Sequence, residues 1–148
     1  IVTDRLEGDT GAAASEIVRA ACEAQACKDV QKPVCLLFGG ETTLQVTGDG
    51  LGGRNQHLAL KAALLLRGRG GIAVLAGGTD GTDGPTDMAG AVVDGNTCAE
   101  AERIGLDPEE SLRAFDSYPF FQKAGGHVRT GPTRTNVMDM AVVIVAQA

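Results

Sequence analysis

The sequence is poor in aromatic residues and in positive charge, and it lacks any long apolar run. Aromatic side chains make up 3% of the 148 residues, and tryptophan is absent. Thirteen basic residues against 19 acidic ones give a formal net charge of -6, which argues against a general nucleic-acid or anionic-membrane surface. A transmembrane helix needs about 20 apolar residues, and no stretch approaches that length. We therefore expect neither nucleic acid nor a membrane as partner.

Cysteine is also sparse, with four residues that form no C-x-x-C pair. The two histidines, His57 and His127, lie far from the cysteines in the sequence, so the spacing typical of a zinc site is missing. Reduced thiols of a cytoplasmic protein are the simpler interpretation, and no signal peptide is apparent at the start. Apolar residues at 43% and charged residues at 22% indicate a globular domain.

Glycine is in excess, with 21 residues, and one cluster matches a phosphate-binding pattern. Gly48 to Gly53 reads G-x-G-x-x-G, as in dinucleotide-binding folds. However, the preceding segment alternates polar and apolar residues, whereas a central parallel strand is solidly apolar. Ala73 stands where that pattern expects an acid. A flexible turn, or an anion-binding loop of another kind with Arg54 at a helix start, are the alternatives. The Walker A and G-x-S-x-G motifs are absent.

Apolar periodicity predicts alternating helices and strands. Helices are expected at residues 10–26, 55–67 and 97–104 and from 107 onward, and strands at 1–3, 34–38, 43–47, 72–76, 91–93, 127–130 and 140–145. Segments 34–38 and 43–47 are expected to form a hairpin, and Thr97 with Glu100 a capping box. The order predicts an α/β fold, namely a three-layer domain with a mixed, mainly parallel sheet flanked by helices, which spans residues 1–148.

Three loops are placed where ligands of α/β proteins commonly bind, beside the ends of predicted strands. They cover residues 48–55, 77–87 and 130–139. The second loop contains Asp80, Asp83 and Asp87, which can act as a general base or bind Mg²⁺, or can simply form Asx-turns in a solvated loop. The third offers hydroxyl and amide groups that suit phosphate or carboxylate oxygens, or a capped turn. Residue types alone leave both pairs of alternatives open.

Five motifs, in order and over nearly the whole chain, resemble the MOFRL family. They are Gly39-Gly-Glu-Thr-Thr43, Gly52-Gly-Arg-Asn-Gln56, Gly78-Thr-Asp-Gly-Thr-Asp-Gly-Pro-Thr-Asp87, Asp116-Ser-Tyr118, and Thr130-Gly-Pro-Thr with Thr135-Asn-Val-Met-Asp139. In that family this is the C-terminal domain of the glycerate 2-kinases often labelled hydroxypyruvate reductase. The resemblance implies a larger N-terminal α/β domain that is absent from this chain, which agrees with a first residue other than Met.

The resemblance also implies an activity: ATP-dependent phosphorylation of the 2-hydroxyl of D-glycerate with Mg²⁺, in a cleft between two domains. A lysine and a carboxylate would come from the N-terminal domain. The family motifs assign catalytic roles here to Arg54, which would place positive charge on the phosphoryl group or the substrate carboxylate, and to Asp80 near the attacking hydroxyl. The metal ligands stay unassigned. Substrate or phosphate contacts are expected from Gly52, Gly53, Asn55, Thr79, Asp83, Thr133, Thr135 and Asn136.

The chain departs from the family pattern at three positions. His57 stands where the family usually has Glu, Phe115 where Asn is common, and Arg134 where Gly is common. His57 is close enough in sequence to Arg54 to alter its hydrogen bonding, and Arg134 adds charge to a loop that is expected to bind ligand.

Three hypotheses follow. The first is half of a glycerate kinase site, with little activity in this chain by itself. The second is NAD(P)H-dependent hydroxypyruvate reduction, which the literal glycine pattern favours. The third is a non-catalytic module that binds a small ligand. A homodimer is compatible with all three. The first hypothesis requires that Arg54 and Asp80 face one common hollow.

Overall fold

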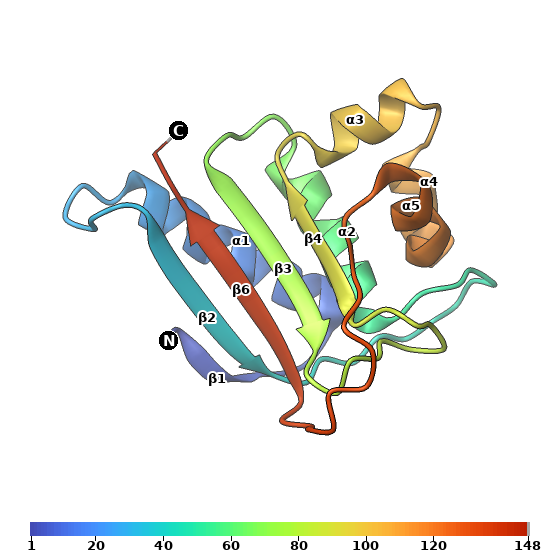
Figure 1. Cartoon of the computed structure of the whole chain (residues 1–148). Helices are drawn as coiled ribbons and strands as arrows, with labels where there is room; N and C mark the ends of the chain where they lie inside the picture. The colour runs from blue at the N-terminus through green and yellow to red at the C-terminus, as the bar shows by residue number, and fades with distance from the viewer. Residues whose placement is uncertain (148) are drawn as a thin grey trace.

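Six strands form one sheet in the computed structural model, which describes residues 1–147 (Figure 1). They are β1 (Thr3–Leu6), β2 (Val34–Gly40), β3 (Ile72–Gly78), β4 (Gly90–Asp94), β5 (His127–Val128) and β6 (Asp139–Val145). The spatial order is β1-β2-β6-β3-β4-β5. The last strand of the chain therefore lies in the middle of the sheet, between β2 and β3.

Five helices accompany the sheet: α1 (Thr10–Ala26), α2 (Arg54–Leu66), α3 (Thr97–Arg103), α4 (Pro108–Arg113) and α5 (Ser117–Ala124). Figure 1 shows α1 and α2 lying together behind the sheet, and the three short helices gather at the end of the molecule beyond α2. Asp9 starts α1, because its side chain accepts a hydrogen bond from the backbone N–H of Ala12. Asp107 caps α4 in the same way, as its sequence predicts.

The core lies between the two long helices and one face of the sheet. Along β6, Ala141, Val143 and Val145 are buried while Met140 and Ile144 are exposed, which is the alternation of a strand with one covered face. Small side chains let the long helices pack closely; those of α2 are Ala59, Ala62 and Ala63, all fully buried. The core thus holds α2, and with it the residues at the helix start, in a fixed position.

The predicted mixed sheet flanked by helices is confirmed, but two details of it were wrong. Only β1 and β2 pair in parallel; the pairs β2–β6, β6–β3, β3–β4 and β4–β5 are antiparallel. The alternation of apolar residues does not depend on strand direction, so it cannot predict it. Because β6 lies between β2 and β3 and runs opposite to both, the pairs at the centre of the sheet are antiparallel. The long helices cover one face, and the face turned to the viewer in Figure 1 carries no helix over β2, β6 and β3, so the helices do not form layers on both sides.

Local predictions failed where tertiary contacts override the sequence pattern. Residues 43–47 form no strand or hairpin, and only Thr43 makes an isolated bridge, to Asp9; both edges of β2 are already occupied, by β1 and β6. The capping box at Thr97 does not form, since the carboxylate of Asp94 accepts the backbone N–H groups of Asn96 and Thr97 instead. Helix α5 was not predicted.

The three predicted loops do meet at one end of the sheet. Gly40 at the end of β2 and Gly78 at the end of β3 both pair with Asp139, the first residue of β6. The loops that follow β2 and β3 and the loop that precedes β6 therefore start or end side by side. Among the described residues, no helix has both the length and the apolar character that crossing a membrane requires.

Candidate active site

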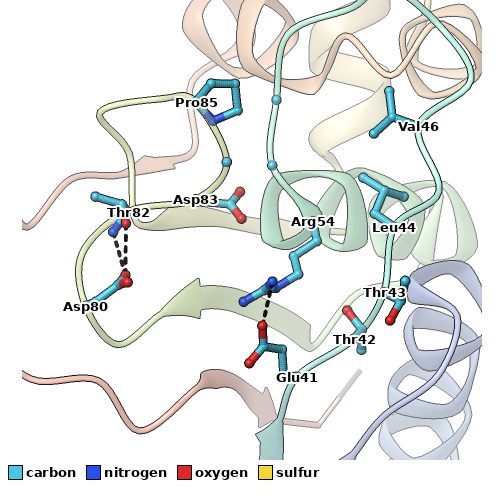
Figure 2. Close-up of a pocket in the computed structure, with 13 residues that line it drawn as sticks. Glu41, Thr42, Thr43, Leu44, Val46, Arg54, Asp80, Thr82, Asp83 and Pro85 are labelled. Atoms are coloured by element: carbon cyan, nitrogen blue, oxygen red, sulfur yellow. Dashed lines mark hydrogen bonds and ion pairs between the residues drawn. The ribbon is translucent and has the colours of Figure 1, made fainter.

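An open cavity of about 700 Å³ lies at this end of the sheet. One wall is the segment after β2, from Glu41 to Val46, and the other is the loop after β3, from Asp80 to Pro85 (Figure 2). Residues 52–54, at the start of α2, lie between the two walls. Arg54 and Asp80 both line this cavity, so the common hollow that the kinase hypothesis requires is present.

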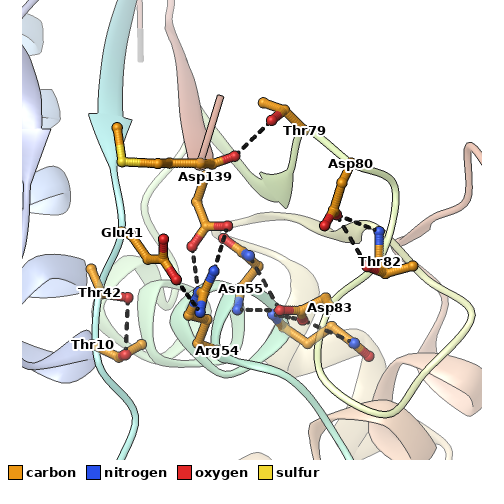
Figure 3. A network of polar contacts seen from close by, with 12 residues as sticks. Thr10, Glu41, Thr42, Arg54, Asn55, Thr79, Asp80, Thr82, Asp83 and Asp139 are labelled. Carbon is orange, nitrogen blue, oxygen red and sulfur yellow. Dashed lines mark hydrogen bonds and ion pairs between the residues drawn. The ribbon is translucent and has the colours of Figure 1, made fainter. Parts of the chain in front are cut away.

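Arg54 is the first residue of α2, and two carboxylates hold its guanidinium (Figure 3). Nε and Nη2 donate to the two oxygens of Asp139 at 2.5 and 3.2 Å. Nη1 forms an ion pair with Glu41 at 2.9 Å. The hydrogen bond with Asp139 is the main cause that raises the pKa of Arg54 above its usual value, against the effect of burial. The side chain is therefore fixed, charged and directed toward the cavity.

Asp80 occupies the opposite wall of the cavity, in a tight turn. Its Oδ1 accepts hydrogen bonds from the backbone N–H of Thr82 at 3.0 Å and from the Thr82 hydroxyl at 3.1 Å (Figure 2). This is the Asx-turn that the sequence allowed, and it orients the carboxylate. Both contacts use Oδ1, which leaves Oδ2 as an acceptor for a hydroxyl or a metal ion.

Asp83 is buried under the start of α2 and is 2% exposed. Its carboxylate accepts the backbone and side-chain N–H groups of both Asn55 and Gln56, over distances of 2.8 to 3.2 Å. Burial raises the pKa of Asp83 from 3.8, and these four hydrogen bonds oppose that rise. Asp83 thus caps α2 from another loop. Asn55, which the sequence analysis expected to contact substrate or phosphate, already has this partner for its backbone and side-chain N–H groups.

The glycine-rich loop before α2 packs against the turn between α4 and α5. A Cβ at Gly50 would lie 2.3 Å from the carbonyl oxygen of Ala114, and one at Gly52 would lie 2.1 Å from Oγ of Ser117. At Gly53 it would lie 2.2 Å from the carboxyl carbon of Asp83. These glycines allow close contact between parts of the same chain. The literal G-x-G-x-x-G pattern therefore has a packing explanation, and the residues directly before it, 44–47, form no strand.

The loop before β6 lies on Thr79 rather than in the cavity. The Thr133 hydroxyl donates to the Thr79 carbonyl, and the Thr79 hydroxyl donates to the carbonyl of Met138. Asn136 accepts a hydrogen bond from the backbone of Met138. Thr133, Thr135 and Asn136 are exposed and outside the cavity lining, so this chain places them beside the site but not in its wall.

Sequence reasoning missed Asp139 and Glu41 as partners of Arg54. Asp139 ends one quoted motif and Glu41 stands within another, but neither was given a role. Their contact with Arg54 depends on the pairing of β2, β6 and β3, which brings Gly40 and Asp139 side by side. The signal that could have found them is their position: Glu41 directly follows β2 and Asp139 begins β6, at the strand ends where the loops of the site were expected to meet.

A comparison with known proteins gives the family. Residues 34–139, more than half of the chain, match the MOFRL family. The chain belongs to the MOFRL family. A D-glycerate 2-kinase of Thermotoga maritima is 48% identical over 118 residues, which are 80% of this chain and 28% of that protein. A glycerate 2-kinase of Pyrococcus horikoshii is 42% identical over 149 residues, with 98% of this chain and 33% of that protein covered.

A solved structure agrees with this assignment. The crystal structure of a glycerate kinase from Thermotoga maritima matches with a TM-score of 0.93 and 43% identity, and it covers 97% of this chain and 35% of that one. The MOFRL domain described here thus spans about a third of the length of the relatives that it matches.

The three departures from the MOFRL pattern have structural correlates. His57 stacks on Phe115 with ring centroids 5.1 Å apart, so two of the departures contact one another, and no hydrogen bond joins His57 to Arg54 among the described residues. Phe115 and Arg134 have φ of 58° and 60°, a left-handed conformation that Asn and Gly adopt at lower cost. The Asn and Gly that the resemblance leads us to expect at positions 115 and 134 would fit this backbone with less strain.

Proposed function

We propose that this MOFRL domain supplies one half of the active site of a glycerate 2-kinase, which transfers a phosphoryl group from ATP to the 2-hydroxyl of D-glycerate. The observation that carries the proposal is the placement of Arg54 and Asp80 in one open cavity, in a chain whose relatives are named glycerate kinases. Because the chain spans about a third of those relatives, the proposal includes an N-terminal domain that closes the cavity and supplies the remaining groups.

In this proposal, Arg54 binds an anionic oxygen of the substrate or of the moving phosphoryl group. Phosphoryl transfer depends mainly on positioning and on stabilisation of developing charge, and a guanidinium that is already fixed by Asp139 needs little reorganisation. Asp80 either accepts the proton of the attacking hydroxyl or orients that hydroxyl. Both roles use Oδ2 of Asp80, and both predict that replacing the Asp80 carboxylate lowers kcat.

Mg²⁺ suits the negative charge of the cavity and would accompany the phosphates of ATP. The carboxylates of Glu41, Asp80 and Asp83 line the cavity together with Arg54, and Asp139 is bonded to the Arg54 guanidinium, so an anionic substrate requires further positive charge. Mg²⁺ is usually bound by one or two carboxylates together with substrate phosphates, and Asp80 would be the ligand from this domain. Within residues 1–147 no group of three or more His, Cys, Asp or Glu side chains is arranged to hold a metal by itself. The lysine implied for the N-terminal domain would supply the remaining charge.

The alternative of a nicotinamide-dependent reductase has less support. Its basis was the glycine pattern, and those glycines contact Ala114, Ser117 and Asp83, while the start of α2 is already capped by Asp83. A non-catalytic binding module would have the same cavity but no partner domain. The cytoplasmic location, inferred from four free cysteines, and the homodimer stay predictions.

A coupled assay of the complete protein tests the proposal. The complete protein should form ADP from ATP only in the presence of D-glycerate, and should not oxidise NADH in the presence of hydroxypyruvate. This chain by itself should show little or no turnover. Robust NADH oxidation would favour the reductase, and the absence of both activities would favour the binding module.

A further inference from the structure

The two carboxylates that hold Arg54 are unequal. Asp139 contacts the guanidinium through two atoms, and only 10% of its side chain is exposed. Glu41 contacts it through one atom, Nη1, and 51% of its side chain is exposed. An exposed ion pair with a single contact is weak, because water solvates both partners when they separate. Asp139 is therefore the permanent partner of Arg54, and Glu41 is the partner that leaves easily.

Glu41 also lies on the cavity side of Arg54. It is part of the wall that lines the cavity, whereas Asp139 is not in the lining. Figure 2 shows Glu41 and Arg54 pointing toward one another at the cavity, with the ion pair between them. A guanidinium carries more N–H groups than these three contacts use, but a second anion beside Glu41 would be repelled by its charge. A ligand anion that binds Arg54 gains most if it replaces Glu41.

We propose that Glu41 is a displaceable counter-ion: it occupies Arg54 in the free protein and yields that place to an anionic group of the substrate, while Asp139 stays bonded. This inference rests on the proposed function only for the identity of the anion, which is then the carboxylate of a small hydroxy acid. Displacement lowers the affinity for any anion by the strength of the Arg54–Glu41 pair. Glu41 therefore weakens the binding of every anion to Arg54, and only an anion that binds more strongly than Glu41 replaces it.

Glu41→Gln tests this by removing the charge and keeping the shape. The chain is titrated with D-glycerate while the side-chain nitrogen signals of Arg54 are followed by NMR. The variant should bind about two- to fivefold more tightly than the unchanged chain, as expected for loss of an exposed ion pair. The Nη signals should shift, and the Nε signal, which reports the bond to Asp139, should stay nearly constant. Glycerol, which has no carboxylate, should cause no shift.

Glu16→Gln is the matched control, because Glu16 is an exposed carboxylate on α1 outside the cavity. It should leave the affinity unchanged. Equal or weaker binding by Glu41→Gln, a matching gain in Glu16→Gln, or no binding by any of the three proteins would each overturn the proposal.

In the complete protein, Glu41→Gln should lower the KM for glycerate by the same factor and leave the KM for ATP unchanged. Asp139→Asn should act in the opposite direction, with a higher KM for glycerate and a lower kcat, since Arg54 loses its fixed partner. Because the titration needs neither ATP nor turnover, failure of the kinase assay with a positive titration would refute the proposed function and leave the role of Glu41 intact.

Discussion

Arg54 and Asp139 are 85 positions apart in the sequence and meet in a two-point ion pair at the end of the sheet. Asp139 is the first residue of β6, and β6 pairs with both β2 and β3. The pair therefore joins the start of α2 to the last strand of the chain, β6. The ion pair connects the packing of the domain to the cavity, because Arg54 begins a helix that the core holds in place and also lines the cavity.

The first prediction concerns the cap of α2. Asp83→Asn replaces one carboxylate oxygen with an NH₂ group that faces N–H donors of Asn55 or Gln56, and we expect a loss of about 2 kcal/mol in the free energy of unfolding. Urea denaturation measures it. Asp49→Asn, at an exposed position of the loop that precedes α2, should change stability little; equal losses in both variants would contradict the capping role.

A second prediction separates packing from ligand approach in the glycine-rich loop. Gly50→Ala places a Cβ 2.3 Å from the Ala114 carbonyl and should cost about 1–3 kcal/mol. Gly70→Ala meets no atom within 4 Å and should be neutral or slightly stabilising. Thermal unfolding of the two variants, without any ligand, gives the comparison. If Gly50→Ala is as stable as Gly70→Ala, the glycines are not needed for packing.

The third prediction concerns the left-handed backbone at Arg134, whose φ is 60°. Arg134→Gly should stabilise the domain by about 0.5–1 kcal/mol, since glycine adopts this conformation without the steric cost, and part of the gain is offset by the greater freedom of glycine in the unfolded chain. Arg134→Ala keeps the steric cost and serves as the control. Chemical denaturation should rank Arg134→Gly above both Arg134→Ala and the unchanged chain.

The fourth prediction is a pH dependence of stability. Burial lowers the pKa of His57 below 6.5, with Lys61 acting in the same direction and Asp9 against it; burial also lowers the pKa of His127, against Asp87. Between the folded-state pKa and 6.5, the unfolded chain binds a proton that the folded chain does not, so the free energy of unfolding falls as the pH falls.

We therefore expect stability to decrease from pH 7.5 to 5.5. His57→Phe keeps an aromatic ring against Phe115 and should reduce this slope, while His127 accounts for part of what remains. Denaturation midpoints at several pH values measure both slopes. An unchanged slope in His57→Phe would show that His57 does not titrate differently on folding.

The sequence predicts the elements well where apolar periodicity is strong. Helices α1 and α2 and the apolar strands β2, β3 and β6 all have nearly the expected bounds, and the Asp107 cap of α4 is local chemistry. The place of β6 between β2 and β3 has no local signal, because strand order depends on contacts between distant segments. For the same reason, the sequence did not identify Asp139 and Glu41 as partners of Arg54, because both are distant from Arg54 in the sequence.

The candidate site shows the same division. Arg54 and Asp80 come from motifs and lie in the cavity. Asp83, however, binds the helix start of its own chain, because a buried carboxylate and a helix N-terminus satisfy one another. Residue types that suit a phosphate also suit such internal contacts, and only the three-dimensional arrangement distinguishes the two uses.

The most direct test of the central claim, that Arg54 and Asp80 act together on one substrate, is the steady-state kcat for glycerate phosphorylation by the complete protein. Arg54→Ala and Asp80→Asn should each lower it by about 100-fold or more, as loss of an electrostatic or acid–base group does. A kcat near that of the unchanged protein in either variant would contradict the claim.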